Sequence, residues 1–471
     1  MMTSRTEATL NNFNEVLKTY LAASLDPSTE LQAYRPPAEL REAVDVSLPE
    51  HGEGESALVG HAQTYLDHSV RTGHWRYMNQ LWSGFSLPGL IGEMATAASN
   101  TSMFTYEVAP VATLVEKALI KRLCELAGFP NGGGLFVTGG SNANLVALMA
   151  ARYRLEPASQ TQGIDGRTLR LFVSDQCHYS FTKAAHVLGL GTRNVVAVPS
   201  DAEGRMDVDA LRRLVAQERA AGARPFCVGA TAGTTVLGAF DPLEAIADVC
   251  EDEGLWFHVD GAWGGSVLMS ERLRGLMAGC ERADSITWDQ HKMMGLPLVC
   301  STILMRDPNL LLKMNGVGGE DYIFHGSEDG DLGPMSLQCG RRVDALKLWL
   351  AWKVYGREGF AQRIEHLFEM AQHLAARVAQ HPDFAMVAPV ASLNICFRYQ
   401  PPGVTEREQL DRILLAARQE LVRSGRLLVN FARLGGQPCW RVVLTNFDLT
   451  QDLVDQAFEE IVSACEDAAK A

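Results

Sequence analysis

The sequence has no apolar run of the roughly 18–20 residues that a transmembrane helix needs, so no membrane span is expected. Residues 1–20 (MMTSRTEATLNNFNEVLKTY) lack the apolar stretch of a signal peptide, and a cytoplasmic protein is therefore the expectation. The 10 cysteines include no CxxC pair, which argues against a zinc site or a disulfide framework. We expect reduced packing cysteines and no bound metal.

Basic side chains are in the minority, with 42 Lys and Arg against 56 Asp and Glu, and the formal net charge is −14. This excess of negative charge opposes non-specific binding to nucleic acid or to an anionic membrane. It does not exclude a locally basic pocket for a small substrate. The 471 residues are too many for one ordinary core, so the chain is expected to form about two or three domains.

The middle of the chain repeats one pattern, in which a short apolar run is followed by a polar or glycine turn and then by a helical stretch. Such runs, buried on both faces and alternating with helices, predict βαβ units and a mostly parallel sheet. The strand-and-turn segments are GLFVTGG (134–140), LRLFVSDQCHYS (169–180), RPFCVGATAGTT (224–235), LWFHVDGAWGG (255–265) and ADSITWDQHK (283–292).

The flanks of this α/β region have a different character. Residues 1–74 predict a helical arm too polar to bury much by itself, and residues 75–345 form the large domain. Residues 346–471 mix helical and strand patterns and predict a smaller α+β domain. A glycine-rich acidic segment at 315–334 is expected to be a loop, and separate helices are expected over 341–356 and 364–381.

Polar residues gather where the predicted strands end. They are Ser141, His178, Thr235, Asp260 and Lys292. Because ligands of open α/β sheets bind beyond the carboxyl ends of the strands, these residues are candidates for one site.

Two of these segments suggest specific ligand groups. Asp260 ends an apolar strand, where a charge is costly unless it is paired; a helix cap or a salt bridge explains it as well as a cationic ligand does. The turn TGGSNA (138–143) between a strand and a helix can present free N–H groups to an anion, although a plain helix start looks the same. It contains neither the P-loop nor the Rossmann glycine pattern.

Together these residues suggest one cofactor. Pyridoxal 5′-phosphate has a group for each of them. Its phosphate fits the anion-binding turn, its ring nitrogen the carboxylate, its ring face an imidazole that can stack, and its aldehyde the lysine. Lys292, in the apolar stretch SITWDQHKMMG (285–295), is then expected to be buried because it is the amine that binds the aldehyde. The alternative is a lysine solvated at a strand end.

The sequence resembles the group II pyridoxal-phosphate-dependent amino-acid decarboxylases, and among them the glutamate and cysteine-sulfinate decarboxylases. The resemblance runs from MNQLWSG (78–84) to CWRVVLTN (439–446). Between these lie NTSMFTYEVAPV (100–111), GGSNANLVALMAARY (139–153), CHYS (177–180), ATAGTTVLGAFDPLEAIADVC (230–250), GLWFHVDGAWGGSVLMS (254–270), ADSITWDQHKMMG (283–295) and LQCGRRVDALKLWLAWK (337–353).

The resemblance implies a fold-type-I α/β protein with a mostly parallel seven-stranded sheet, working as a homodimer whose N-terminal arms are exchanged. It implies a role for each motif residue. Lys292 would hold the cofactor and Asp260 would pair with its ring nitrogen. His178 and Ala262 would contact the ring faces, and Thr235 would lie near the ring. The phosphate would be held by Gly140, Ser141 and His291. Arg441 would bind the substrate carboxylate and Gln80 would contact the substrate.

The sequence departs from the family pattern at several points. The loop between Tyr322 and Arg341 is shorter and has no tyrosine after DYIF, so the group that protonates Cα is open, with His325 and His178 as candidates. Without such an acid, aldehyde formation is a possible side outcome. Asp289 and Gln290 stand where the relatives have Asn-Pro. Trp82 replaces a usually smaller residue, which suggests a tighter pocket.

The resemblance leaves the substrate open within a class. We expect a small acidic L-amino acid, namely glutamate, aspartate, cysteine sulfinate or cysteate, with 2,4-diaminobutyrate as an alternative. The sequence is also compatible with an aminotransferase on the same fold, or with a protein that binds the cofactor without turnover, because a fold does not fix the reaction.

Overall fold

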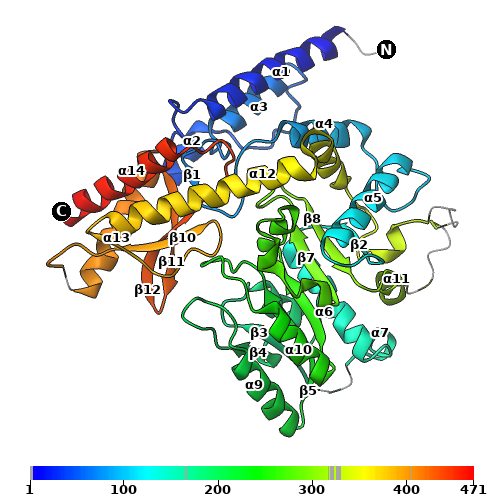
Figure 1. The fold of residues 1–471 in the computed structure, drawn as a ribbon. Helices are drawn as coiled ribbons and strands as arrows, with labels where there is room; N and C mark the ends of the chain where they lie inside the picture. Colours follow the sequence, from blue (N-terminus) through cyan, green and yellow to red (C-terminus); the bar gives the residue numbers. More distant parts are fainter. Residues whose placement is uncertain are drawn as a thin grey trace. The chain divides into compact units, whose positions relative to one another are not determined.

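The computed structural model describes residues 4–470 except 165, 167, 317, 319–322, 325–329 and 405 (Figure 1). The chain divides into two compact units. The first unit comprises Met1–Phe85, Gln372–Val387 and Ile395–Ala471, and the second comprises Ser86–Ala371 and Ala388–Asn394.

The second unit is built on a seven-stranded sheet with the order β2-β8-β7-β6-β5-β3-β4. Only β8 runs against its neighbours, so β2 and β3–β7 all point the same way. The strands are β2 (Gly133–Val137), β3 (Leu169–Ser174), β4 (Val195–Val198), β5 (Arg224–Thr231), β6 (Trp256–Asp260), β7 (Ser285–Asp289) and β8 (Ser301–Met305). The mostly parallel sheet predicted from the alternating apolar runs is confirmed.

The helices of this unit cover both faces of the sheet. The connections β2-α6-β3 and β3-α8-β4 cross the sheet in one direction, and β4-α9-β5 and β5-α10-β6 cross it in the other. Because such crossovers are right-handed, the two pairs of helices lie on opposite faces. The helices are α4 (Leu87–Ser99), α5 (Pro110–Leu126), α6 (Gly140–Leu155), α7 (Ser159–Gln162), α8 (Ser180–Val187), α9 (Val208–Ala220), α10 (Leu243–Glu253) and α11 (Leu310–Asn315).

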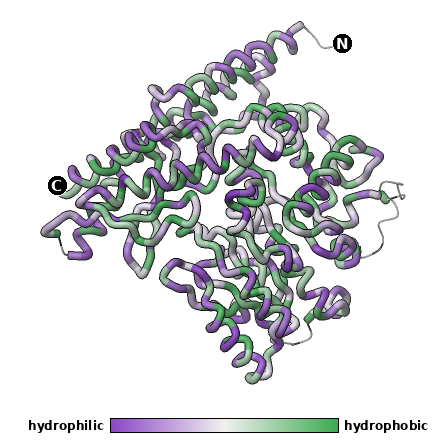
Figure 2. The backbone as a smooth tube through the Cα atoms, in the orientation of Figure 1, coloured by the Kyte–Doolittle hydropathy of each residue, from purple (hydrophilic) through white to green (hydrophobic). Residues whose placement is uncertain are grey.

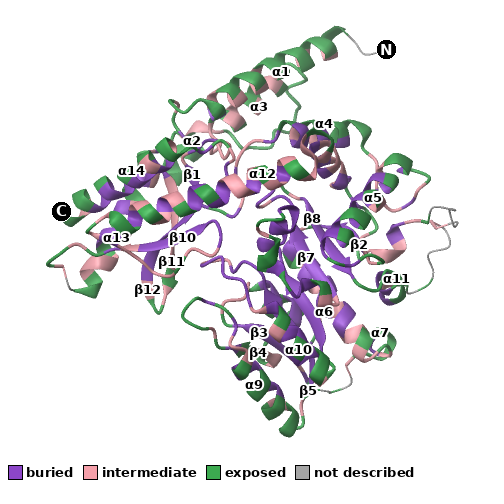
Figure 3. Cartoon of the chain, in the orientation of Figure 1, coloured by how far each residue is buried: buried purple, intermediate pink, exposed green. Residues whose placement is uncertain are grey.

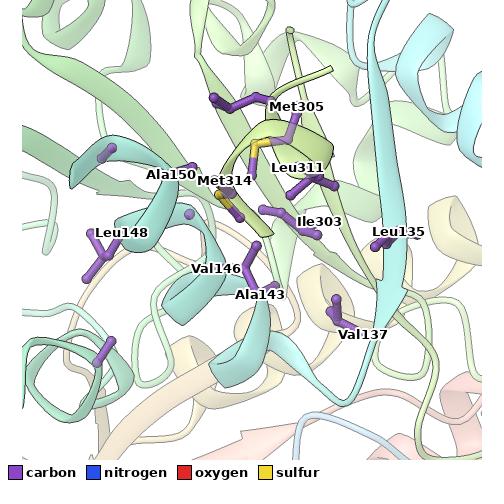
Figure 4. Packing of buried hydrophobic residues seen from close by; sticks show 14 of the residues in the cluster. Leu135, Val137, Ala143, Val146, Leu148, Ala150, Ile303, Met305, Leu311 and Met314 are labelled. Atoms are coloured by element: carbon purple, nitrogen blue, oxygen red, sulfur yellow. The ribbon is translucent and has the colours of Figure 1, made fainter. Parts of the chain in front are cut away.

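The core under α6 follows the two-residue period of the strands. Leu135 and Val137 of β2 and Ile303 and Met305 of β8 face the same cluster as the small residues of α6 (Figure 4). The intervening residues point to the other face of the sheet. Strands β6, β7 and β8 are buried along their whole length, whereas the edge strand β4 is mostly not buried and the surrounding helices expose one side (Figure 3). Burial on both faces is why the central strand sequences read as continuous apolar runs.

The first unit has a five-stranded sheet with the order β1-β11-β12-β10-β9. Its strands are β1 (Tyr77–Met78), β9 (Phe384–Met386), β10 (Asn394–Tyr399), β11 (Leu428–Leu434) and β12 (Gln437–Val443). Its helices are α1 (Ser4–Leu25), α2 (Pro37–Ala43), α3 (Leu58–Asp67), α13 (Arg407–Arg423) and α14 (Gln451–Lys470). Phe384, Phe397 and Phe458 meet edge to face, which ties α14 to the sheet.

Helix α12 (Ala345–Gln380) contributes residues to both units. Like α14, it alternates hydrophilic and hydrophobic residues along its length (Figure 2). The element consists of two helical stretches separated at Gly356, where φ is 62° and the backbone is not helical, so the separate helices expected over 341–356 and 364–381 are confirmed. Short 3-10 helices occupy Thr192–Asn194, Gly264–Met269, Arg274–Met277, Cys280–Arg282 and Gly333–Met335.

Strand β1 pairs with β11, so Tyr77 and Met78 join the sheet built from the C-terminal region. The three-part division at residues 74 and 345 stays a prediction. All 10 cysteines are free and most are buried, which confirms their assignment as packing residues. Of the helices described, none is long and apolar enough to cross a membrane.

Candidate active site

The candidate residues of the second unit lie at one edge of the seven-stranded sheet. Strands β2, β3, β5, β6 and β7 are parallel, so their carboxyl ends meet at this edge. Each predicted residue ends one of these strands or follows it within a few positions. They are Gly140, Ser141, His178, Thr235, Asp260, Ala262, His291 and Lys292.

Helix α6 begins at this edge with its backbone donors available. Gly139 has φ of 107°, a conformation that glycine adopts without strain, and the helix starts at Gly140 with no side chain capping it. Within the part of the chain that is described, the N–H groups of Gly140 and Ser141 have no acceptor. A Cβ on Gly140 would stand 2.6 Å from Asp289 Oδ2, so glycine is required there by close contact. The helix start can therefore receive an anion.

Asp260 ends β6 and is 4% exposed. Its Oδ1 accepts from the backbone N–H of Ala262 at 3.1 Å, and its Oδ2 accepts from Asn144 Nδ2 at 2.8 Å. Among the described residues Asp260 forms no ion pair. A buried carboxylate held only by neutral donors is costly, and it retains the capacity to pair with a cationic ligand group.

Lys292 follows β7 by three residues. Its Nζ lies 3.0 Å from Asp289 Oδ2, and its side chain is 21% exposed. Asp289 is almost fully buried and also accepts from Ser301 Oγ at 2.6 Å. The sequence suggested a lysine buried among apolar groups; the structure instead gives it a buried carboxylate partner and partial access to solvent, so the amine can be reached.

The two candidate histidines are both partly desolvated. His178 Nδ1 accepts from the backbone N–H of Ser180 at 3.3 Å, and burial lowers the pKa of its imidazole. His291 Nδ1 lies 2.9 Å from the carbonyl oxygen of Cys300, and its Nε2 lies 3.8 Å from Asp289 Oδ2. Burial likewise lowers the pKa of His291. Both rings are therefore expected to be mostly neutral near pH 7.

Thr235 and Ala262 complete this edge. Thr235 is half-buried, and its carbonyl oxygen accepts from Asn394 Nδ2 at 2.9 Å. Ala262 is 8% exposed. Neither residue adds a charge, which is consistent with close approach of a flat ring.

The two predicted substrate residues belong to the first unit. Arg441 lies on β12 and is 6% exposed, and its Nη1 donates to the carbonyl oxygen of Asn79 at 3.4 Å. Burial lowers the pKa of its guanidinium. Gln80 is exposed, and its Nε2 lies 3.4 Å from Asn79 Oδ1. The segment at 79–80 therefore brings these two residues into one neighbourhood. Trp82 nearby is half-buried and contacts the ring of Tyr77.

The sequence analysis missed Asn144, His258 and Thr287, which lie behind Asp260. All three are buried, and the Asn144 amide contacts the other two. The only signal in the sequence was polar residues inside otherwise apolar elements. His325 and Tyr322, which bear on the source of the Cα proton, lie outside the described residues. Across the described chain no group of three or more His, Cys, Asp or Glu is arranged to hold a metal ion.

The residues present fit pyridoxal phosphate on three observations of the structure. In the described part of the chain Asp260 is a buried carboxylate with only neutral hydrogen-bond donors. Within the same residues, the N–H groups of Gly140 and Ser141 at the start of α6 have no acceptor. An accessible lysine amine follows the strand next to Asp260. A cationic ring nitrogen, a phosphate and an aldehyde match these three features.

Residues 37–400 match the family described as "Pyridoxal-dependent decarboxylase conserved domain". The chain belongs to this family. It is therefore a pyridoxal-dependent decarboxylase, as the motifs predicted.

Curated relatives of this decarboxylase match over nearly the whole chain. It is 38% identical to cysteine sulfinic acid decarboxylase of Mus musculus over 462 residues, which cover 95% of this chain and 94% of the relative. It is 37% identical to the acidic amino acid decarboxylase GADL1 of Mus musculus over 461 residues, covering 95% and 84%.

Solved structures agree on the fold of this decarboxylase. The crystal structure of mouse CSAD matches with a TM-score of 0.95 at 38% identity, covering 98% of each chain. The structure of Oryza sativa TDC with PLP and tryptamine matches with a TM-score of 0.90 at 25% identity, covering 99% of each chain. The predicted fold-type-I architecture and the cofactor are thereby confirmed.

Proposed function

We propose that this decarboxylase removes the α-carboxylate of a small acidic L-amino acid, giving the amine and carbon dioxide. The candidates are cysteine sulfinate, cysteate, aspartate and glutamate. The proposal depends on one structural observation. A buried carboxylate with no ion pair among the described residues ends β6, and an accessible lysine follows the neighbouring strand β7. The substrate class is supported by relatives named for cysteine sulfinate and for acidic amino acids at 37–38% identity.

The cofactor would be held by the residues at the sheet edge. Lys292 would bind its aldehyde carbon, and Asp260 its ring nitrogen. His178 and Ala262 would contact the ring faces, and Thr235 its rim. Gly140, Ser141 and His291 would hold the phosphate, with the start of α6 supplying N–H donors. When bound, pyridoxal phosphate supplies a protonated ring that accepts the electron pair released as the Cα–carboxylate bond breaks.

The protein residues set the charges around that ring. Asp260 would lie next to the ring nitrogen as the carboxylate that pairs with its proton. Asp289 pairs with the Lys292 amine while that amine is unattached, with 3.0 Å between Oδ2 and Nζ. The neutral imidazole of His178 adds no charge at the ring face, and burial favours this form by lowering its pKa.

Substrate binding is assigned to Arg441 and Gln80. A guanidinium can hold a carboxylate through two parallel hydrogen bonds and thereby fix its orientation. Gln80 would contact the substrate through its amide. His178 is the candidate within the described residues for returning a proton to Cα, and its Nε2 is the atom that would carry it, because Nδ1 already accepts from Ser180.

We also propose that the enzyme is a cytoplasmic homodimer in which residues 1–74 pack on the partner. The arm exposes large apolar side chains, among them Leu48, Leu58 and Tyr65, which a dimer would bury. Light scattering on the full chain and on a chain that starts at residue 75 measures the mass. A full chain that stays monomeric at micromolar concentration would contradict the dimer.

An amine-product screen tests the reaction. The purified protein is loaded with pyridoxal phosphate and incubated with each acidic candidate and with 2,4-diaminobutyrate, all labelled at the α-carboxyl carbon. Labelled carbon dioxide and one amine, identified by mass spectrometry, are expected from at least one acidic candidate and not from a Lys292→Ala control. Keto acid in place of amine would identify an aminotransferase, and turnover of the diamino acid alone would overturn the substrate class.

A further inference from the structure

The side chain of Asn144 is 1% exposed and lies between Asp260 and His258. We propose that Asn144 is a positioning residue that holds Asp260 toward the cofactor's ring nitrogen, and that His258 fixes the orientation of the Asn144 amide. The proposal rests on the function proposed above, in which Asp260 pairs with that nitrogen. Asn144 itself acts only through Asp260.

Every hydrogen-bonding position of the Asn144 amide is used. Its Nδ2 donates to Asp260 Oδ2 at 2.8 Å and to Ser180 Oγ at 2.9 Å. Its Oδ1 accepts from Thr287 Oγ1 at 2.7 Å and lies 3.0 Å from His258 Nε2. An asparagine amide has two N–H donors and an oxygen with two lone pairs, so no capacity is left over. Rotating the amide by 180° would place its oxygen against the carboxylate.

The orientation of the amide follows from a chain of donors that begins on the far side of His258. Trp256 Nε1 can only donate, and it lies 2.9 Å from Ser285 Oγ. Ser285 accepts there and can donate its own hydrogen to His258 Nδ1, which is 2.9 Å away. The Asn144 oxygen that faces His258 Nε2 favours this arrangement, because two acceptors would otherwise face each other. With Nδ1 accepting, the ring hydrogen sits on Nε2 and points at Asn144 Oδ1. Burial lowers the pKa of His258 to about 4, so this neutral tautomer persists at neutral pH.

The network holds Asp260 without neutralising it. Both donors to the carboxylate, Asn144 Nδ2 and the Ala262 N–H, are uncharged. The titratable groups that face Asp260 are His258 on β6, and Cys177 and His178 on the segment between β3 and α8. Burial favours the neutral form of all three, since it raises the pKa of Cys177 to about 12 and lowers the pKa of both histidines. The full negative charge is then available to the ring nitrogen.

The test uses pyridoxal phosphate labelled with 15N at the ring nitrogen, because the NMR shift of that atom reports its protonation independently of turnover. Asn144→Leu removes the donor to Asp260 at similar volume. We expect the resonance to move toward the unprotonated position and kcat to fall by roughly 10- to 100-fold, the loss that follows from removing a hydrogen bond to a charged group. KM should change much less.

Ser266→Ala is the matched control. Ser266 is fully buried and accepts from Trp288 Nε1 at 3.0 Å, so its loss also removes a buried hydrogen bond, but among the described residues its side chain shares no hydrogen bond with Asp260 or Asn144. Its resonance and kcat should stay at the wild-type values. A second pair of variants keeps Asn144 in place. His258→Leu removes the donor to the amide oxygen, and His258→Gln restores an N–H near the same position, so the second should recover most of what the first loses.

The outcomes separate this proposal from the function on which it depends. If Asp260→Ala shifts the resonance while Asn144→Leu and His258→Leu behave like Ser266→Ala, the positioning role is overturned and the role of Asp260 stands. If Asp260→Ala also leaves the resonance unchanged, the role of Asp260 is wrong and the proposal is overturned with it. Should Asn144→Leu not fold, the His258 pair decides, and equal spectra for Leu and Gln at 258 would overturn the proposal.

Discussion

Two buried carboxylates end neighbouring strands of the same sheet and are stabilised in different ways. Asp260 at the end of β6 accepts from an asparagine amide and a backbone N–H, both neutral. Asp289 at the end of β7 accepts from the hydroxyl of Ser301 and lies 3.0 Å from the ammonium of Lys292. The first carboxylate has no cationic partner in the described chain, and the second has one.

Asp260 can therefore still pair with a cationic ligand group, whereas the charge of Asp289 is already balanced by Lys292. A buried charge is costly to leave unpaired, so a carboxylate with only neutral partners needs a reason to persist. The proposed reason is the cationic ring nitrogen of the cofactor. Asp289 needs no ligand while Lys292 is free, but it loses its counter-charge when the lysine becomes attached. The two carboxylates are thus expected to respond oppositely to cofactor binding.

Removing the lysine should have the largest effect. Lys292→Ala is expected to abolish covalent attachment of the cofactor, seen as loss of its visible absorbance band after gel filtration and of the adduct mass after reduction with borohydride. Activity should fall by roughly 10⁴-fold or more, because no other amine replaces it. The matched control is Lys313→Ala, which removes an exposed lysine that also pairs with an aspartate, Asp307, at 3.4 Å. A persisting adduct would refute the assignment of Lys292.

Removing the cation-free carboxylate should have the next largest effect. Asp260→Ala is expected to lower kcat by roughly 10³-fold, since the ring nitrogen loses the charge that keeps it protonated. The cofactor should still attach to Lys292, so the absorbance band should remain while its response to substrate weakens. Near-normal turnover in the variant would contradict the role of Asp260.

The sequence predicted the sheet well because each strand is buried on both faces, and apolar runs between glycine turns leave few alternatives. It also selected Asp260 and Lys292, since a charge at the end of an apolar strand is unusual. The two separate helices expected over 341–356 and 364–381 are confirmed, since the backbone at Gly356 is not helical and divides α12 into two stretches.

The sequence could not predict the partners of these charges. Asn144 lies within a helix and meets Asp260, Ser180, Thr287 and His258 from three other segments, so the direction of its amide depends on contacts that no local pattern encodes. Lys292 was expected to be buried because its neighbours are apolar. Its accessibility and its pairing with Asp289 depend instead on the conformation of the turn after β7. The fact that the two residues are three positions apart in the sequence does not specify that conformation.

The neutral network behind Asp260 should make stability depend on pH. Burial lowers the pKa of His258 from 6.5 to about 4, so between these values the unfolded chain binds a proton that the folded chain does not. Stability contributed by neutral His258 is present above pH 6.5 and is lost as the pH falls toward 4. From pH 7.5 to 5 the loss should be about 2 kcal/mol of unfolding free energy.

Denaturant titration of wild type and His258→Gln at these two pH values measures this loss. The variant should lose about 2 kcal/mol less than wild type between pH 7.5 and 5, whatever its stability at pH 7.5. His74 in the first unit, whose pKa burial also lowers to about 4, contributes equally to both proteins and cancels in the difference. His186→Gln, at an exposed position on α8, is the control. Parallel pH profiles for wild type and His258→Gln would contradict a buried neutral imidazole.

Replacing the carboxylate that already has a cation should have the smallest effect and the opposite direction. In the unloaded protein Asp289 pairs with the Lys292 ammonium at 3.0 Å, and an ammonium cannot attack an aldehyde. Asp289→Asn keeps an acceptor for Ser301 and breaks this ion pair, which leaves the amine less restrained for attack. We expect pyridoxal phosphate to attach about three- to tenfold faster at pH 7.5, the range of a partly exposed ion pair worth about 1 kcal/mol.

Stopped-flow absorbance measures the rate of attachment. Asp307→Asn is the control, since it removes the negative charge from the exposed ion pair with Lys313. An unchanged or slower attachment would mean that Asp289 orients the amine more than it restrains it, and the contrast between the two carboxylates would then concern geometry and not charge.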